Sequence, residues 1–296
     1  MEPAAPKLAV IVPFRSSMSS FKARRFEQLH LFLREMSSTL GVLETAGHLS
    51  GWEIFVAEQS SDSRPFNRGQ LLNAGALQAM REGYDSLCFH DVDLVLGDLE
   101  TVQKMVAAST LAESTWRESQ AVDWTAACGM LYALSPRPRP IHIGWSWSKY
   151  KYDDYCGGIL TVDAHQFRSC QGFPNTLWGW GGEDDVLATR LRSVVKPRPK
   201  SEFVVDKASA VTMHDYVERT VLRAGLMDLG QYFEWIGLET VTKRDLNSKK
   251  KKVVWEARSN PMGDGLRTCG ASILRSRQLS PRVCIMTYHL QGPSCA

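Results

Sequence analysis

The chain has 296 residues, of which 44% are hydrophobic and 23% are charged, an ordinary globular composition that is long enough for one large domain or two small ones. The formal net charge of +3 is too small to indicate nucleic acid as a partner. The N-terminus shows neither a basic segment leading into an apolar stretch nor a membrane span, so the chain as given is expected to be soluble.

The first third of the sequence alternates between strand and helix patterns. Residues 7–14, KLAVIVPF, form an apolar run rich in β-branched residues and predict a buried strand. Apolar residues at helical spacing predict a helix over 21–40, followed by a strand over 52–57, a helix over 71–80 and a strand over 86–89. This order is typical of an α/β fold, in which ligands bind beyond the carboxyl ends of the strands.

The remaining sequence gives weaker signals. Residues 137–154 are rich in Pro, Trp and Tyr and predict a loop, and residues 155–162 have strand character. A helix is expected over 184–192, with acidic residues in its first turn, where the helix dipole favours negative charge. Residues 216–252 are interpreted as a helix and a charged loop, and residues 283–290 as the last strand.

Two acids, Asp91 and Asp93, follow the third predicted strand. On an extended segment their side chains would point the same way and could hold a divalent cation, but Asp is equally common in strand-end turns. His214 could supply a second ligand, and imidazole with carboxylate suits manganese better than magnesium. A lone histidine, however, is more often a structural residue, so both interpretations stand.

The segment WGWGGEDD, residues 178–185, combines aromatic rings, glycines and carboxylates. Aromatic faces stack on sugar rings, glycines let the backbone approach a ligand, and a carboxylate can take a proton from a hydroxyl group. The alternative is a tight glycine turn with buried tryptophans before an acidic helix start. That alternative explains Gly179, Gly181 and Asp185, but it leaves two seemingly exposed tryptophans beside three acids unexplained.

Two aromatic–arginine pairs lie near predicted strand ends, Phe14-Arg15 and Phe66-Asn67-Arg68. Such pairs can hold a nucleotide base and its phosphates, although an arginine packed on a neighbouring ring is the simpler explanation of each pair alone. The sequence contains no GxGxxG after a strand, no GxxxxGK[ST] and no GxSxG, which excludes the dinucleotide-binding, P-loop and hydrolase interpretations.

Read in order, the motifs KLAVIVPFR, RRFEQL, FNRGQLLNAG, FHDVDL, YCGGIL, GFPNTLWGWGGEDD, MHD and DGLRT resemble the β-1,4-galactosyltransferase family from about residue 7 to residue 290. The resemblance implies an α/β GT-A-like nucleotide-sugar transferase fold with a mixed central sheet flanked by helices. It also implies a single catalytic domain over 1–296, with a nucleotide-binding part at about 7–100 and an acceptor and metal-completing part at about 140–296.

The resemblance further implies inverting transfer of galactose from UDP-galactose to a sugar hydroxyl in β-1,4 linkage, with Mn2+. YCGGIL looks closest to the branch that galactosylates xylose, whereas WGWGGEDD looks more like the lactose and N-glycan branch, so xylose-type and GlcNAc-type acceptors both stay open. Family members are Golgi type II membrane proteins, which implies a luminal Golgi location with the anchor outside this chain. The alternatives are an N-acetylgalactosaminyl- or glucosyltransferase on the same fold, or a catalytically inactive sugar-binding protein.

The resemblance assigns roles residue by residue. Asp184 matches the catalytic base, with Glu183 beside it. Arg25, from RRFEQL, is preferred for the diphosphate because an insertion follows Arg15. Donor-binding residues would be Pro13, Phe14, Arg15, Arg25, Phe66, Arg68, Asp91, Val92, Tyr155, Gly158 and Trp180, and acceptor-binding residues would be Tyr152, Trp180, Glu183, Asp184 and Asp185. The metal ligands would be Asp93 and His214, with Met213 or Thr212 as a third.

Overall fold

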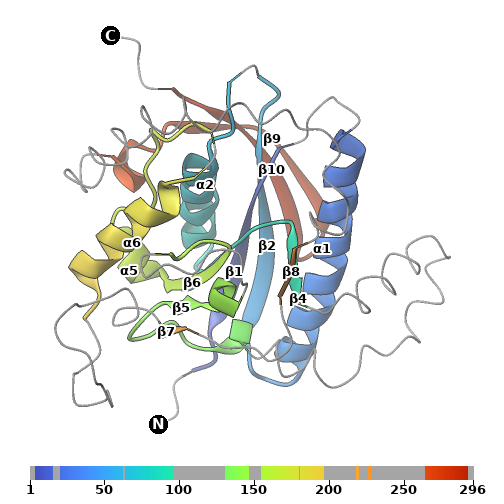
Figure 1. The fold of residues 1–296 in the computed structure, drawn as a ribbon. Coiled ribbons are helices and arrows are strands. Elements are labelled where there is room, and N and C mark those ends of the chain that lie inside the picture. The colour runs from blue at the N-terminus through green and yellow to red at the C-terminus, as the bar shows by residue number, and fades with distance from the viewer. Residues whose placement is uncertain are drawn as a thin grey trace.

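A mixed eight-stranded sheet forms the centre of the protein (Figure 1). The computed structural model describes residues 4–15, 21–62, 64–96, 131–146, 155–179, 181–196, 218–219, 226–228 and 264–292. The sheet has the strand order β7-β5-β6-β3-β1-β2-β10-β9. Its strands are β1 (Lys7–Phe14), β2 (Gly51–Gln59), β3 (Ser86–His90), β5 (Ile141–His142), β6 (Ile159–Asp163), β7 (Glu218–Arg219), β9 (Ala271–Ser280) and β10 (Val283–Leu290).

The middle of the sheet is parallel. Strand β1 pairs in parallel with β2 and with β3, and β10 pairs in parallel with β2. The outer pairings bring in antiparallel strands, since β6 runs opposite to β3 and β9 runs opposite to β10. Every residue of β1 after Lys7 is buried, as expected of a central strand covered by helices on both faces.

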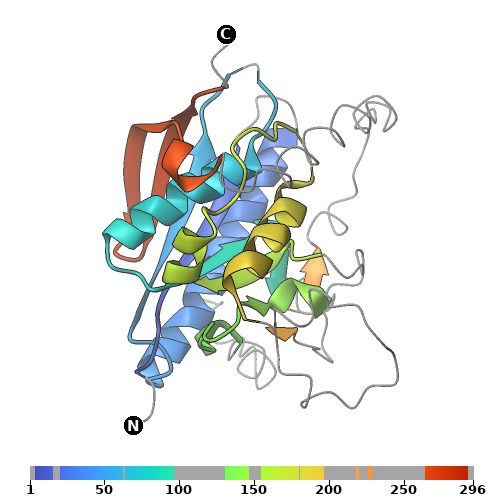
Figure 2. The same cartoon turned by 90° about the vertical axis from the view of Figure 1, so that its left-hand side faces the viewer.

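Helices cover the two faces of the sheet, as Figures 1 and 2 show. On one face, α1 (Phe21–Thr45) buries Phe32, Met36 and Leu40 against alternate residues of the central strands. On the other face, α2 (Arg68–Arg81), α5 (Ala164–Ser169) and α6 (Glu183–Val194) enclose a second core that contains Ile11 and Phe89. Successive side chains of each strand point to opposite faces of the sheet, so the strands contribute residues to two separate hydrophobic cores.

Strand β9 differs from the rest of the sheet. Among the described residues it is an edge strand that pairs with β10 (Figure 2). Its residues after Ala271 are exposed. The exposed side chains include Ile273, Leu274 and Leu279, interspersed with Arg275 and Arg277. Arginines and two register shifts in the β9–β10 pairing are devices that discourage further strands from adding to an edge.

Most of the predicted elements are confirmed. The strands over 7–14 and 283–290 have the predicted bounds, and those over 52–57 and 86–89 are longer by a few residues. Helix α1 continues to Thr45, and α2 begins three residues before the predicted start because Asn67 caps it by accepting a hydrogen bond from the Gln70 amide at 2.9 Å. Helix α6 begins at Glu183, so the acidic cluster does form its first turn.

Three predictions in the second half were wrong in part. Residues 155–158 form a loop, not a strand, and β6 begins only at Ile159, because Gly158 has a φ of +80°. The predicted loop over 137–154 contains β5 and the 3-10 helix η1 (Ile143–Ser146), and its residues 147–154 lie outside the described residues. Within 216–252, the described residues form β7 and β8 (Leu226–Asp228), which pairs with β4 (Leu94–Leu96), rather than a helix.

Candidate active site

Arg68, the first residue of α2, is the charged centre of a polar cluster beyond the carboxyl ends of β1 and β3. Its Nε lies 2.8 Å and a terminal nitrogen 2.7 Å from Asp91 Oδ1, and its other terminal nitrogen lies 3.3 Å from Glu183 Oε1. Burial alone would lower the pKa of Arg68, but the carboxylates of Asp91, Glu183 and Asp184 raise it above its ordinary value. The guanidinium therefore stays charged and joins the third strand to helix α6.

Asp91 and Asp93 lie in a turn, which corrects the extended segment expected from the sequence. The Leu94 amide donates to the Asp91 carbonyl at 3.2 Å, and the Asp91 amide donates to the Gly158 carbonyl at 3.0 Å. The two carboxylates therefore do not share one strand face. Asp91 pairs with Arg68, whereas Asp93 is half-buried next to the fully buried Val92.

The base of this turn is fixed by the buried imidazole of His90. Its Nδ1 lies 2.8 Å from the Asp91 carbonyl and its Nε2 lies 2.8 Å from the Tyr132 hydroxyl. Burial lowers the pKa of His90 to about 4, so the ring is neutral at neutral pH. Since a carbonyl only accepts, Nδ1 carries the proton and Nε2 accepts from the tyrosine.

Glycines with a left-handed backbone conformation lead into helix α6, which begins with the acidic residues of WGWGGEDD. Gly179, Gly181 and Gly182 have φ values of +86°, +84° and +94°, a region that side chains rarely adopt. Helix α6 then presents the predicted carboxylates in its first turn. Glu183 is buried and faces Arg68, whereas Asp184 and Asp185 are half-buried.

Asp184 has the most perturbed carboxyl group of the cluster. Burial is the largest cause, and the negative charges of Glu183 and Asp185 add to it, so that the pKa of Asp184 rises to about 7 despite the opposing effect of Arg68. A carboxylate with a pKa near the working pH is suited to accept a proton, and strongly perturbed groups gather at functional sites.

The loop before β6 packs directly on Asp184. A Cβ atom placed on Gly157 would lie 2.3 Å from Asp184 Oδ2 and 2.9 Å from Tyr155 Cε2, so any side chain at this position would displace the Asp184 carboxylate or the Tyr155 ring. The Cys156 thiol lies 3.1 Å from the Asp184 carbonyl. His142 Nε2 lies 2.8 Å from the Gly157 carbonyl and anchors the loop from β5. The predicted residue Tyr155 therefore lies near the predicted base, whereas a Cβ on Gly158 would meet Leu94 and the Tyr155 hydroxyl.

The two aromatic–arginine motifs lie at neighbouring strand ends. Pro13 and Phe14 are buried within β1, and the guanidinium of Arg15 donates to the Arg64 carbonyl at 2.6 Å and contacts Asp62. Phe66 is half-buried, and its carbonyl accepts from the Gly179 amide at 2.7 Å. Arg25 is half-buried on α1, in a different element from the cluster around Arg68.

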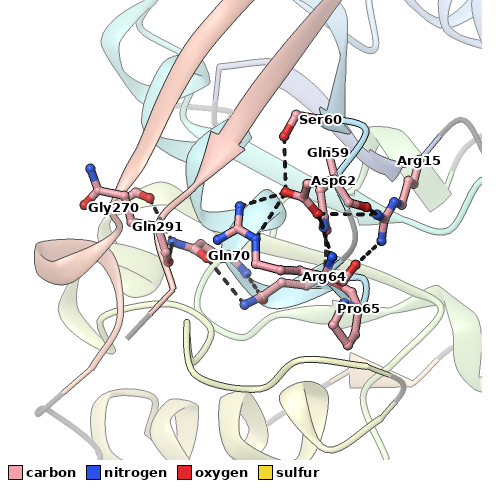
Figure 3. A network of polar contacts seen from close by, with 10 residues as sticks. Arg15, Gln59, Ser60, Asp62, Arg64, Pro65, Gln70, Gly270 and Gln291 are labelled. Carbon is pink, nitrogen blue, oxygen red and sulfur yellow. Dashed lines mark hydrogen bonds and ion pairs between the residues drawn. The ribbon is translucent and has the colours of Figure 1, made fainter. Parts of the chain in front are cut away.

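Asp62 is a functional candidate that sequence reasoning missed. Figure 3 shows its carboxylate between the side chains of Arg64 and Arg15, with Gln59 and Ser60 also in reach. Partial burial would raise the pKa of Asp62, but side-chain and backbone hydrogen bonds from Arg64 outweigh it and lower that pKa. The available signal was the Asp-Ser-Arg-Pro sequence directly before the FNR motif.

A second missed cluster joins α2 to two distant segments. Asn73, fully buried in the middle of α2, exchanges hydrogen bonds with the Phe173 backbone at 2.7 and 2.9 Å and donates to Asn175 at 2.9 Å. Asn175 in turn donates to the Gly265 carbonyl at 2.7 Å, and its amide donates to Asp264 at 2.9 Å. The signal was an asparagine within an otherwise apolar helix face.

Several predicted site residues fall outside the described residues, namely Tyr152, Trp180, Thr212, Met213 and His214. Within the described part of the chain, no group of three or more His, Cys, Asp or Glu side chains is placed to hold a metal ion. Trp178 is half-buried rather than exposed, which corrects one of the two tryptophans expected at the surface. No helix among the described residues is long and apolar enough to cross a membrane.

Two family models match this chain. The N-terminal region of glycosyl transferase group 7 matches residues 3–104, and the N-terminal domain of galactosyltransferase matches residues 141–196, so together they span more than half of the sequence. The chain is 32% identical over 186 residues to beta-1,4-galactosyltransferase 7 of Drosophila melanogaster. The aligned region covers 63% of this chain and 45% of the relative. The chain belongs to the β-1,4-galactosyltransferase family.

Other β-1,4-galactosyltransferases support the same assignment. Beta-1,4-galactosyltransferase 4 of Rattus norvegicus is 30% identical over 203 residues, 66% of this chain and 46% of the relative. The chain thus spans about half the length of these curated relatives. The catalytic domain of Drosophila β-1,4-galactosyltransferase 7 in complex with xylobiose superposes with a TM-score of 0.60 at 24% identity, covering 97% of this chain and 95% of that chain. The predicted GT-A fold is confirmed.

Proposed function

We propose that this member of the β-1,4-galactosyltransferase family transfers galactose from UDP-galactose to a sugar hydroxyl with inversion at the anomeric carbon. The observation that carries the proposal is Asp184, a half-buried carboxylate with a pKa raised to about 7, held between the Gly157 loop and the cluster of Arg68. In support, a mutant of the Drosophila relative with a TM-score of 0.59 and 23% identity was solved with manganese, UDP-Gal and xylobiose.

In the proposed reaction, Asp184 takes the proton of the acceptor hydroxyl. The acceptor oxygen forms its bond to the anomeric carbon as the bond from that carbon to the diphosphate oxygen breaks, and UDP leaves with the electron pair. A single in-line displacement inverts the centre, by the geometric logic of inverting glycoside hydrolysis. The pKa of Asp184 suits it to this step, because a substantial fraction of the carboxyl is ionised near pH 7 and that form is basic enough to accept a proton.

The buried residues around Asp184 have supporting roles in this proposal. Arg68 holds Asp91 at the donor and Glu183 beside the base, so Glu183 orients the site and leaves proton transfer to Asp184. Asp185 and Asp184 face the acceptor. The further proposed donor-binding residues are Pro13, Phe14, Arg15, Arg25, Phe66, Val92, Tyr155 and Gly158.

Manganese is part of the proposal. The half-buried carboxylate of Asp93, in the turn after β3, is an oxygen ligand that fits a divalent cation such as Mn2+. His214, with Met213 or Thr212, would complete the ligand set, but those residues lie outside the described part of the chain. When bound, the metal neutralises negative charge on the leaving diphosphate.

The single catalytic domain over 1–296 and the luminal Golgi location also stay predictions. Microscopy of the tagged protein against a Golgi marker tests the location.

An acceptor screen tests the proposed function. The protein is incubated with UDP-galactose, MnCl2 and matched β-xylosides and GlcNAc β-glycosides, and both UDP release and galactosylated product are measured. Transfer to one acceptor class is expected, and xylosides are the first choice because the similar solved structures contain xylobiose. Absence of UDP release with every acceptor, and of UDP-galactose hydrolysis, would contradict the proposal.

The same assay separates the alternatives. Competition between UDP-galactose and UDP-GalNAc or UDP-glucose identifies the donor, and the tyrosine at position 155 favours galactose by resemblance to the family. A catalytically inactive sugar-binding protein would release no UDP. Calorimetric titration of UDP with and without manganese then distinguishes an intact donor site from a lost one.

A further inference from the structure

Arg64 links the two halves of the proposed site through its guanidinium. On one side, its Nε and a terminal nitrogen lie 3.2 and 2.7 Å from Asp62 Oδ2 (Figure 3). On the other side, the guanidinium carbon lies 4.8 Å from the centre of the Trp178 ring, within the range of a cation–π contact. One side chain thus joins the loop between β2 and α2 to the segment that leads into α6.

The carboxylate of Asp62 holds Arg64 in that position. Asp62 Oδ1 accepts from the Arg64 backbone amide at 3.1 Å, so the residue is fixed through both its side chain and its backbone. The same carboxylate contacts the Arg15 guanidinium at 3.4 Å, and Arg15 also donates to the Arg64 carbonyl. Both side-chain nitrogens of Arg64 donate to the same oxygen, Asp62 Oδ2, and this planar fork is specific to arginine because a lysine ammonium has no second nitrogen.

The two segments are also joined by their backbones. The Gly179 amide donates to the Phe66 carbonyl at 2.7 Å, only two residues from Arg64 in sequence. Gly179, Gly181 and Gly182 all have left-handed φ values, and a Cβ placed on Gly179 would meet no atom within 4 Å. Glycine restricts the backbone little, so this segment does not hold its own conformation. Contacts from other parts of the protein must therefore fix the residues that lead into α6.

We infer that Asp62 and Arg64 are positioning residues, which hold the Trp178–Gly179 segment and thereby set where Asp184 lies relative to the donor. This inference rests on the proposed function, because it concerns the same reaction. Neither residue needs to touch substrate, since Arg64 acts through Trp178 and Asp62 acts through Arg64. A displacement of about 1 Å in a reacting group can lower a rate by roughly a hundredfold. Loss of the Arg64–Trp178 contact should therefore lower kcat more than it weakens donor binding.

The test compares Arg64→Leu with a matched control, Arg282→Leu. Arg282 has the same type of partners at the far end of the sheet: it lies 2.7 Å from Glu44 Oε1, and its guanidinium carbon lies 5.8 Å from the Trp52 ring centre. For Arg64→Leu we expect kcat to fall about tenfold or more while KM for UDP-galactose changes less than about twofold. Arg282→Leu should leave both constants within about twofold of the wild type.

Milder variants guard against a folding defect. Asp62→Asn keeps the shape of the side chain and should lower kcat less than Arg64→Leu does. Arg64→Lys keeps the charge over Trp178 but loses the fork, and it should recover part of the lost kcat. Unchanged kcat in Arg64→Leu would overturn the inference, and so would a loss confined to the donor KM, which would make Arg64 a direct donor contact.

Hydrogen exchange gives a readout that needs no activity. Because Gly179 donates to Phe66, peptides covering residues 175–187 should exchange about fivefold faster or more in Arg64→Leu and at the wild-type rate in Arg282→Leu. If the wild type transfers no galactose but this difference appears, the proposed function fails and the positioning contact stands. If kcat falls without faster exchange in this segment, the positioning inference fails.

Discussion

Asp184 and Gly157 are packed so closely that a single methyl group does not fit between them. A Cβ on Gly157 would lie 2.3 Å from Asp184 Oδ2, well inside van der Waals contact. Gly157→Ala should therefore push the carboxylate aside and lower kcat by roughly a hundredfold, with a smaller effect on donor binding. Steady-state kinetics and UDP calorimetry measure the two effects separately. Gly41→Ala, on α1 with no atom within 4 Å of its Cβ, is the matched control and should be neutral in activity.

The activity should depend on pH through Asp184. Its pKa is raised to about 7, and only the ionised form can take the acceptor proton, so kcat/KM should rise with pH and level off above about 7. Below that value the rate should fall by about tenfold per pH unit, because the ionised fraction does. A profile that stays flat from pH 5 to pH 8 would show that another group controls the step.

Asp184→Asn should abolish galactose transfer but leave manganese-dependent UDP binding intact.

Asp184→Asn should also change how the free energy of unfolding depends on pH. The folded protein holds the Asp184 proton more tightly than the unfolded chain does, because folding raises the pKa of this carboxyl to about 7. Between about pH 4 and pH 7 the unfolded chain has already lost that proton, so the wild type loses stability as pH rises through this range. The amide does not titrate. Urea unfolding should therefore find the variant stabilised relative to wild type at pH 8 and close to it at pH 4.

Replacing Arg68 should cost more stability than replacing any exposed arginine of the same helix. Arg68→Met leaves Asp91 and Glu183 without their shared cation, and breaking such a buried pair typically costs about 3–5 kcal/mol. Arg81→Met, the same change at the exposed end of α2, should cost less than about 1 kcal/mol. Chemical denaturation at pH 7.5 measures both. Equal losses in the two variants would mean that the cluster contributes no net stability.

The parts of the fold that the sequence predicted well are those in which one local pattern decides the structure. The run over β1 is apolar at nearly every position because helices cover both faces, and the spacing of apolar residues along α2 and α6 is a local signal. Strand β9 was missed because its residues are exposed on both faces and no alternation marks them. The Gly158 loop was taken for a strand because its apolar neighbours lead directly into β6.

For the candidate site, sequence could name residues but could not give their pairings. That Arg68 would pair with both Asp91 and Glu183 depends on α2, β3 and α6 meeting, a tertiary relationship that no spacing reveals. The role of Asp62 was harder to find, because the sequence before the FNR motif marks its position but not its pairing with Arg64 and Arg15. The resemblance to a family supplied the expected roles, and the structure supplied the contacts from which each role can be tested.

The antiparallel pairing of β3 with β6 has a consequence for how such a protein can diversify. The hydrogen bond from the Asp91 amide to the Gly158 carbonyl and the register of His90 opposite Ile159 hold the two sides of the proposed donor site together, although they lie far apart in sequence. Segments of another length could therefore be grafted between the two strands to seek new acceptors, while the residues proposed to bind the nucleotide sugar keep their positions.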